Sequence, residues 1–304
     1  PRRGHDDAPI MAKESRRLPT NVPGDFYVDS GCIDCGTCRW VALGTFDGKN
    51  DQSFVRQQPE GAQIEAALRA VVACPTGSIG TVAKHDLTAA MASFPMPIDP
   101  REDTGVYHLG FHSRDSFGAA SYLIVRPDGR NVMVDSPRFN KGLVERINAL
   151  GGVHTMFLTH RDDVADHDRY AAAFGATRIM HKRDLRPHTR SVENLVEISG
   201  PTPLDDELLM IPVPGHTQGS MCLLYKDRFL FSGDHLAWDI LRKRLFSFRQ
   251  ACWYDWDQQI ASTEALRGRS FEWVLPGHGP RGKASAEAMQ QALEGCIAWM
   301  RKAA

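Results

Sequence analysis

The stretch Thr159-His160-Arg161-Asp162-Asp163-Val164-Ala165-Asp166-His167 decides the predicted fold. It follows an apolar run, Val153 to Leu158, that indicates a short buried strand. Side chains that follow such a strand lie at the edge of a sheet, where α/β folds place their functional sites. Alternate residues of an extended chain point the same way, so His160 and Asp162 are expected to converge. Two histidines and three aspartates so close together are typical of a first-row metal site rather than of a core.

Three later fragments share one pattern, in which an apolar strand leads through a glycine to a residue that can bind metal. They are Pro212-Val213-Pro214-Gly215-His216-Thr217, Leu230-Phe231-Ser232-Gly233-Asp234-His235 and Val274-Leu275-Pro276-Gly277-His278-Gly279. Together with the first stretch they resemble the metallo-β-lactamase fold superfamily, whose signature is H-x-H-x-D-H, then a lone His, a lone Asp and a lone His. The resemblance covers residues 105–304 and implies an α/β fold, an αββα sandwich of two packed sheets with helices outside.

The resemblance also implies a metal site with two positions. The ligands implied for the first position are His160, Asp162 and His216, those for the second are Asp166, His167 and His278, and Asp234 bridges the two. Two divalent ions about 3.5–4 Å apart activate a water molecule between them, which is hydrolytic chemistry. Asp166 is expected to orient that water as the catalytic residue. His235, beside Asp234, is expected to support the ligands from behind.

The sequence departs from the superfamily signature in one place. Asp162 stands where the second His of the motif belongs, and two extra residues precede the Asp166-His167 pair. Asp163 therefore competes with Asp162 as the ligand. A carboxylate in place of an imidazole makes the site harder and favours Fe or Mn over Zn. One or two divalent ions, Zn or Fe and also Mn, are consistent with these residues.

A cysteine cluster near the start of the chain predicts a second cofactor. Cys32, Cys35 and Cys38 follow the spacing C-x2-C-x2-C, and Ala42 stands where the usual ferredoxin run has its fourth cysteine. Cys74, followed by Pro75, is the best remaining ligand. The segment from Asp25 to about Thr81 resembles a single-cluster 4Fe–4S ferredoxin of bacterial type, a small α+β domain. A zinc site is the rival interpretation, but zinc ribbons prefer two CxxC pairs. Both a redox-active and a purely structural cluster stay open.

These assignments predict the organisation of the chain. Residues 1–24 are expected to be an N-terminal extension, 25–82 the ferredoxin-like domain, 83–104 a proline-containing linker and 105–304 the catalytic domain. The remaining cysteines are interpreted as small apolar residues, and His112 and His181 as surface or packing residues. These five residues are Cys222, Cys252, Cys296, His112 and His181.

Composition limits the partners. The formal net charge of −1 gives no field that favours nucleic acid. No apolar run approaches the roughly 20 residues of a membrane span. No secretory signal is visible, so a cytoplasmic location is expected; an organelle stays open because the sequence starts at Pro1 rather than at Met. The expected partners are a small-molecule substrate and a redox partner for the cluster, with no nucleic acid and no membrane.

Three functions follow from this sequence. The leading one is a metal-dependent hydrolase of an ester, thioester or similar small substrate. The superfamily also includes iron-dependent redox members, so the alternative is a non-haem iron oxidoreductase that receives electrons from the fused cluster. The third is a non-enzymatic iron–sulfur protein that transfers electrons or acts as a sensor.

Overall fold

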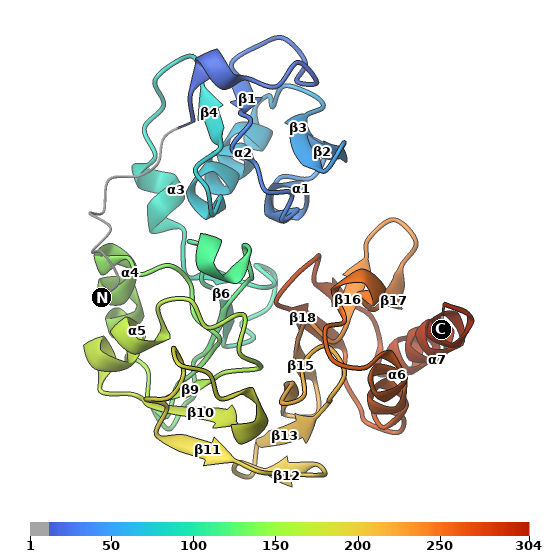
Figure 1. The fold of residues 1–304 in the computed structure, drawn as a ribbon. Helices are drawn as coiled ribbons and strands as arrows, with labels where there is room; N and C mark the ends of the chain where they lie inside the picture. Colours follow the sequence, from blue (N-terminus) through green and yellow to red (C-terminus); the bar gives the residue numbers. More distant parts are fainter. Residues whose placement is uncertain (1–11, 304) are drawn as a thin grey trace. The chain divides into compact units, whose positions relative to one another are not determined.

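The computed structural model describes residues 12–303, which form two compact units (Figure 1). The N-terminal unit comprises residues 12–93 and 111–118, and the C-terminal unit comprises 94–110 and 119–303. Within the described range no helix combines the length and the apolar character needed to cross a lipid bilayer. The two units are described separately below.

The N-terminal unit is built from two small sheets and short helices. Its strands are β1 (Phe26–Val28), which pairs antiparallel with β4 (Ile79–Thr81), and the hairpin of β2 (Phe46–Lys49) and β3 (Gln52–Val55). Asn50 and Asp51 both have φ of 54°, as the tight turn of this hairpin requires. The helices are η1 (Glu14–Arg16), α1 (Thr37–Val41), α2 (Ala62–Ala73), α3 (Thr88–Ala92) and η2 (Arg114–Ser116). Apolar side chains of the strands and of α2 form the core, including Phe26, Val28, Phe46, Val55, Ala67 and Ile79.

Two segments differ from the expected organisation. Of the extension predicted over residues 1–24, residues 1–11 lie outside the described range, whereas Leu18 and Val22 pack against the core of the N-terminal unit. The linker predicted over 83–104 carries α3 and a strand, β5 (Met96–Pro97). Its prolines suggested a linker, but β5 is the edge strand of its sheet, where proline is tolerated.

The C-terminal unit contains a seven-stranded and a six-stranded sheet. The first has the order β11-β10-β9-β8-β7-β6-β5 and the second β12-β13-β14-β15-β18-β19. Beyond β5, the strands of the first sheet are β6 (Val106–His108), β7 (Tyr122–Ile124), β8 (Val132–Val134), β9 (Thr155–Phe157), β10 (Thr177–His181) and β11 (Asn194–Val196). Those of the second are β12 (Thr202–Pro203), β13 (Leu208–Pro212), β14 (Met221–Tyr225), β15 (Phe229–Gly233), β18 (Trp273–Pro276) and β19 (Gly282–Lys283). A separate hairpin joins β16 (Ala237–Asp239) to β17 (Arg244–Phe246).

Helices cover the outer face of each sheet, which gives four layers (Figure 1). Two helices, α4 (Lys141–Ala149) and α5 (His167–Phe174), lie on the outer side of the first sheet, and α6 (Trp256–Glu264) and α7 (Ala286–Lys302) lie on the outer side of the second. Two short turns, η3 (Lys182–Asp184) and η4 (Arg249–Ala251), complete the unit. Leu293 and Ile297 of α7 join one apolar cluster with Leu230 and Val274 of the second sheet. The predicted αββα architecture is confirmed by this layering.

Parallel pairing decides which residues meet at the sheet edges. Strands β15 and β18 are parallel with Gly233 opposite Pro276, so Asp234 and His278 leave neighbouring strand ends together. Strands β8 and β9 are also parallel, with Val134 opposite Phe157. The residues after them, Asp135 and Leu158 to His160, therefore emerge side by side. The fold thus gathers at one edge several of the side chains that the sequence separates.

The layering predicts where truncation of a leucine destabilises the fold. Leu293 is fully buried, whereas Leu241 in the β16–β17 turn is 91% exposed. We expect Leu293→Ala to lower the free energy of unfolding by about 2–5 kcal/mol, because it leaves a cavity beneath α7. The matched change Leu241→Ala should cost less than about 0.5 kcal/mol. Chemical denaturation of both variants measures the difference, and equal losses would contradict the placement of α7.

Candidate metal centre

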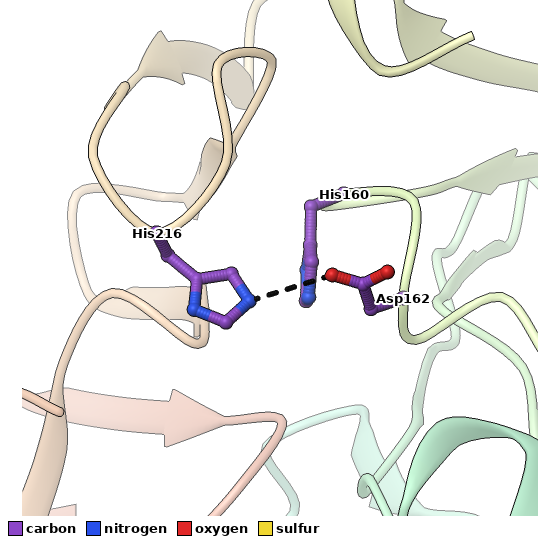
Figure 2. Close-up of side chains that lie close together, drawn as sticks. All are labelled: His160, Asp162 and His216. Atoms are coloured by element: carbon purple, nitrogen blue, oxygen red, sulfur yellow. Dashed lines mark ion pairs between the residues drawn. The ribbon is translucent and has the colours of Figure 1, made fainter. Parts of the chain in front are cut away.

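Two overlapping groups of side chains form the candidate centre. His160, Asp162 and His216 offer ligand atoms that lie within 4.8 Å of one another, and so do His160, Asp163 and Asp234. Figure 2 shows the first group, with His216 facing the carboxylate of Asp162 and the ring of His160 beside them. Nε2 of His216 lies 3.8 Å from Oδ2 of Asp162 and 3.6 Å from Oδ2 of Asp234. His160 belongs to both groups.

His278 joins the second group through Asp234. Its Nδ1 lies 2.7 Å from Oδ1 of Asp234 and 3.9 Å from Oδ1 of Asp163. Nε2 of His160 lies 3.8 Å from an oxygen of each of these aspartates. Separations of 3.6–3.9 Å are too long for hydrogen bonds. They are close to the roughly 3.4 Å that separates two ligands on one tetrahedral ion with bonds of about 2.1 Å.

Buried atoms at this site fit a cation. Both carboxylate oxygens of Asp163 and Nε2 of His160 and of His216 are buried and have no hydrogen-bond partner among residues 12–303. A buried polar atom without a hydrogen bond is costly, and a buried charge is retained only where it is paired or coordinates a metal. The donor set of imidazoles and carboxylates suits Zn, Fe or Mn. The residues present therefore fit the divalent ions that the sequence predicts.

The pKa shifts of the clustered residues also fit a bound cation. Burial raises the pKa of Asp163 well above its usual range, and the neighbouring Asp234 adds to the shift. Burial likewise raises the pKa of Asp135 to about 8. Burial, and next the approach of His216, lowers the pKa of His160 to about 4. For Asp234 burial acts upward, but His278, His160 and His216 together outweigh it, so the pKa of this carboxyl is lowered. Metal binding requires a neutral imidazole, and the lowered pKa of His160 favours that form.

Two further aspartates hold the loops that carry the candidate ligands. Asp135 accepts hydrogen bonds from the backbone N–H (2.8 Å) and the hydroxyl (2.9 Å) of Thr159, the residue before His160. Asp184 is fully buried and accepts from N of Arg161 at 3.1 Å, from the hydroxyl of Thr217 at 2.6 Å and from N of Gly219 at 2.9 Å. Asp184 therefore ties the His160 loop to the His216 loop. The sequence analysis missed both residues. Asp135 could have been found because it directly follows an apolar strand, whereas no sequence pattern indicated Asp184.

The structure does not bring Asp166 to this cluster, which corrects the predicted ligand and catalytic assignment. The chain turns at Ala165, whose φ is 33°, and Asp166 then lies at the start of α5. Oδ2 of Asp166 accepts the backbone N–H of Phe139 at 2.7 Å, and its other oxygen lies 3.7 Å from Arg169. The two extra residues of the motif carry Asp166 past the sheet edge. Asp163, the competing candidate, lies in the cluster instead, and Asp162 lies there too.

His167 is also directed away from the cluster, so its predicted role as a ligand needs the same correction. It is the first residue of α5 and is buried. Nη1 of Arg178 lies 3.1 Å from Nδ1 of His167, and Nε2 of His167 donates to the carbonyl of His188 at 3.3 Å. Burial is the main cause that lowers the pKa of His167. Both ring nitrogens therefore serve the packing of α5.

Two other residues near the cluster have distinct surroundings. His235 is buried, and its Nε2 lies 3.2 Å from the hydroxyl of Thr263 in α6. The contact of His235 is therefore with α6, and its predicted support of the ligands stays a prediction. Trp253 is 63% exposed, and its ring lies 6.3 Å from that of His216. An aromatic surface open to solvent thus lies beside a candidate ligand.

The four cysteines of the predicted cluster line one pocket of the N-terminal unit. The backbone N–H of Ser53 donates to Sγ of Cys32, and that of Ser78 donates to Sγ of Cys74, both at 3.3 Å. Burial raises the pKa of the Cys35 thiol to about 11 and also raises that of Cys38 well above its usual value. Iron would hold these sulfurs as thiolates and the N–H groups would stabilise their charge. The set Cys32, Cys35, Cys38 and Cys74 therefore fits an iron–sulfur cluster.

Comparison with known proteins agrees for this unit. Residues 28–81 match the family described as the 4Fe-4S single cluster domain of Ferredoxin I. The predicted ferredoxin-like domain is confirmed. The match begins within β1 and ends at the last residue of β4, so it encloses all four cysteines.

Similar proteins are also known beyond this domain. YobT, an uncharacterized protein of Bacillus subtilis (strain 168), is 27% identical over 204 residues, which are 56% of this chain and 88% of that protein. Solved structures with a similar fold include the BLEG-1 B3 metallo-β-lactamase, with 18% identity, a TM-score of 0.49 and coverage of 61% of this chain and 95% of that one. The flavodiiron protein from Giardia intestinalis has 20% identity, a TM-score of 0.46 and coverage of 65% and 58%. These structures belong to the metallo-β-lactamase superfamily that the sequence resembles.

The placement of the aspartates predicts which of them binds metal. We expect Asp163→Asn to reduce bound divalent metal by at least about tenfold at limiting metal, because it removes a buried carboxylate from the cluster. Asp166→Asn is the matched control, since its amide oxygen can still accept the N–H of Phe139. Metal content after dialysis against a weak chelator measures both. Loss of metal in Asp166→Asn with full retention in Asp163→Asn would restore the original assignment.

Proposed function

We propose that the C-terminal unit is a metal-dependent hydrolase that acts on an ester, a thioester or a similar small substrate. The observation that carries this proposal is the pair of overlapping ligand groups, which share His160 and meet at Asp234. The free Nε2 of His160 can bind only one of two neighbouring cations, so the other would be held by Asp163, Asp234 and His278. When bound, these ions would supply an activated water molecule and polarise a carbonyl oxygen.

The side chains of the chain itself divide the remaining tasks. Asp163 and Asp234 lie deep in the centre, with side chains 1% and 10% exposed, and offset the charge of the cations. The side chain of Asp162 is 46% exposed, so it is the carboxylate that solvent and substrate reach. We assign to Asp163 the orienting role expected of Asp166, because it is buried within the cluster. Trp253 offers an apolar surface next to His216 for the rest of a small substrate.

The alternative is a non-haem iron oxidoreductase, and one feature of the chain favours it. Gly118 lies against Cys35 within the N-terminal unit. Two residues further on, the backbone N–H of Ala120 donates to the carbonyl of Gly277 at 2.7 Å, and His278 follows Gly277. Residues 118–120 are therefore one continuous stretch of chain, with one end against a cluster cysteine and the other hydrogen-bonded to the residue before a candidate metal ligand. In this version a reducing compartment such as the cytoplasm and an external redox partner would keep the cluster supplied with electrons.

The hydrolase proposal predicts activity with zinc alone. Zinc-loaded protein should hydrolyse generic ester or thioester probes. Asp234→Asn should lower kcat/KM by at least about 100-fold, because it removes the carboxylate that lies beside His160, His216 and His278. Asp166→Asn should retain most of the activity, since Asp166 lies outside the cluster. Persistence of activity in Asp234→Asn would refute the assignment.

Loss of the iron–sulfur cluster distinguishes the hydrolase proposal from the oxidoreductase alternative. Cys74→Ser removes one cluster ligand, and under the hydrolase proposal the zinc-loaded variant should keep its rate of probe hydrolysis. Under the oxidoreductase alternative only iron-loaded protein with an electron donor is active, and Cys74→Ser abolishes turnover. Absence of metal in the C-terminal unit of protein purified without oxygen would favour the non-enzymatic electron-transfer or sensor function.

A further inference from the structure

A segment outside the ferredoxin match belongs to the N-terminal unit. Residues 111–118 follow β6 and precede β7, two adjacent strands of the seven-stranded sheet, yet they group with residues 12–93. The segment contains η2, whose first turn is fixed by the side chain of Ser113, which accepts the N–H of Asp115. The match that identifies the ferredoxin domain ends at residue 81. The surroundings of the cluster therefore include residues that the match does not contain.

The segment reaches the cysteine pocket through Gly118. The φ of this residue is +88°, and a Cβ built on it would lie 2.7 Å from Cβ and 2.9 Å from Sγ of Cys35 and 3.2 Å from Pro75. Real Cβ atoms do not approach other atoms that closely, so only glycine fits against this cysteine. The backbone of the segment thus covers one side of a cluster ligand.

His112 belongs to the same segment. Its side chain is fully buried, and its ring lies 5.8 Å from that of Trp40 in α1. Nδ1 of His112 is 2.6 Å from the carbonyl oxygen of Gly118 and 3.3 Å from Oγ1 of Thr37. The interpretation of His112 as a plain surface or packing residue is thereby replaced by a specific contact with the cluster domain.

The protons of this network can be placed by elimination. A carbonyl oxygen only accepts, so Nδ1 of His112 carries a hydrogen and donates it to Gly118. Nδ1 therefore cannot accept from Thr37, whose Oγ1 lies 3.4 Å from Sγ of Cys35 and 3.3 Å from the Gly118 carbonyl. That carbonyl can accept two hydrogen bonds and already accepts the shorter one from His112, whereas a thiolate is the charged and stronger acceptor. With Cys35 in the thiolate form that iron requires, the Thr37 hydroxyl donates to the sulfur.

We propose that residues 111–118 complete the iron–sulfur site and that the pair Thr37–His112 sets the reduction potential of the cluster. Gly118 encloses Cys35, and His112 orients the Thr37 hydroxyl toward the Cys35 sulfur. A hydrogen bond to a cluster sulfur favours the reduced state, because that state carries the greater negative charge. This inference concerns the cluster domain and holds whether the C-terminal unit is a hydrolase or an oxidoreductase.

The covering role is tested with two glycine variants of the full chain. In Gly118→Ala the new methyl group meets Cys35, and in Gly44→Ala it meets nothing within 4 Å, although Gly44 has a similar φ of +85°. Both variants carry the same backbone strain, so any difference reports the contact. We expect Gly118→Ala to lose most of its iron and sulfide after anaerobic purification, while Gly44→Ala retains them.

Circular dichroism of the same samples shows whether each variant is folded. Retention of iron and sulfide in Gly118→Ala at the level of Gly44→Ala would overturn the covering role. So would equal loss in both variants, because the strain alone would then explain it.

The tuning role is tested by the reduction potential, measured by anaerobic titration followed by electron paramagnetic resonance. Thr37→Val removes the hydroxyl at nearly constant volume and should shift the potential to more negative values. Thr37→Ser keeps a hydroxyl and should restore the wild-type value. His112→Phe should shift the potential in the same direction, because the Thr37 hydroxyl is then free to turn to the Gly118 carbonyl.

The double variant decides whether the two residues act together. If His112 acts through Thr37, the combination of Thr37→Val with His112→Phe shifts the potential no further than Thr37→Val alone. An unchanged potential in Thr37→Val, a shift in Thr37→Ser equal to that in Thr37→Val, or additive shifts in the double variant would overturn the tuning role.

Discussion

The structure depends on the burial of carboxyl groups at the ends of parallel strands. Parallel pairing of β15 with β18 forces Asp234 and His278 to leave the second sheet together, and pairing of β8 with β9 does the same for Asp135 and the residues before His160. Antiparallel strands would send these ends to opposite edges. Once gathered, the carboxyls lie out of reach of water, and a cation relieves their mutual repulsion. The fold therefore favours the metal-binding chemistry that we propose, before any particular substrate is considered.

Residues that follow a strand directly were the predictable part of the site. His160, His216, Asp234 and His278 each come within a few residues of a regular strand, so the strand pattern and the family resemblance together predicted one shared site. The pair Asp166-His167 was assigned from the spacing of a motif. Two extra residues precede this pair, and such an insertion changes where the following side chains lie. Asp163 was available from the sequence only as a competitor of Asp162. The turn at Ala165, which separates Asp166 from both, could not be predicted from the spacing.

The organisation of the N-terminal unit shows a second limit of sequence reasoning. The cysteine spacing was sufficient to predict a single cluster with Cys74 as its last ligand. Local patterns could not indicate that residues 111–118 belong to that unit, because the segment lies between two strands of another sheet. Only long-range contacts, such as that of Gly118 with Cys35, assign it. A glycine with positive φ was visible in the sequence merely as one glycine among 26.

The charge of the candidate centre bears on the number of ions that it suits. Its histidines are neutral ligands, and Asp162, Asp163 and Asp234 bring three negative charges when ionised. One divalent cation would leave the buried site negative, which is costly at low dielectric. Two divalent cations would leave one positive charge, which suits a polarised carbonyl oxygen or an anionic substrate. Charge balance is therefore our argument for proposing two ions rather than one, and it applies to the hydrolase and to the oxidoreductase alike.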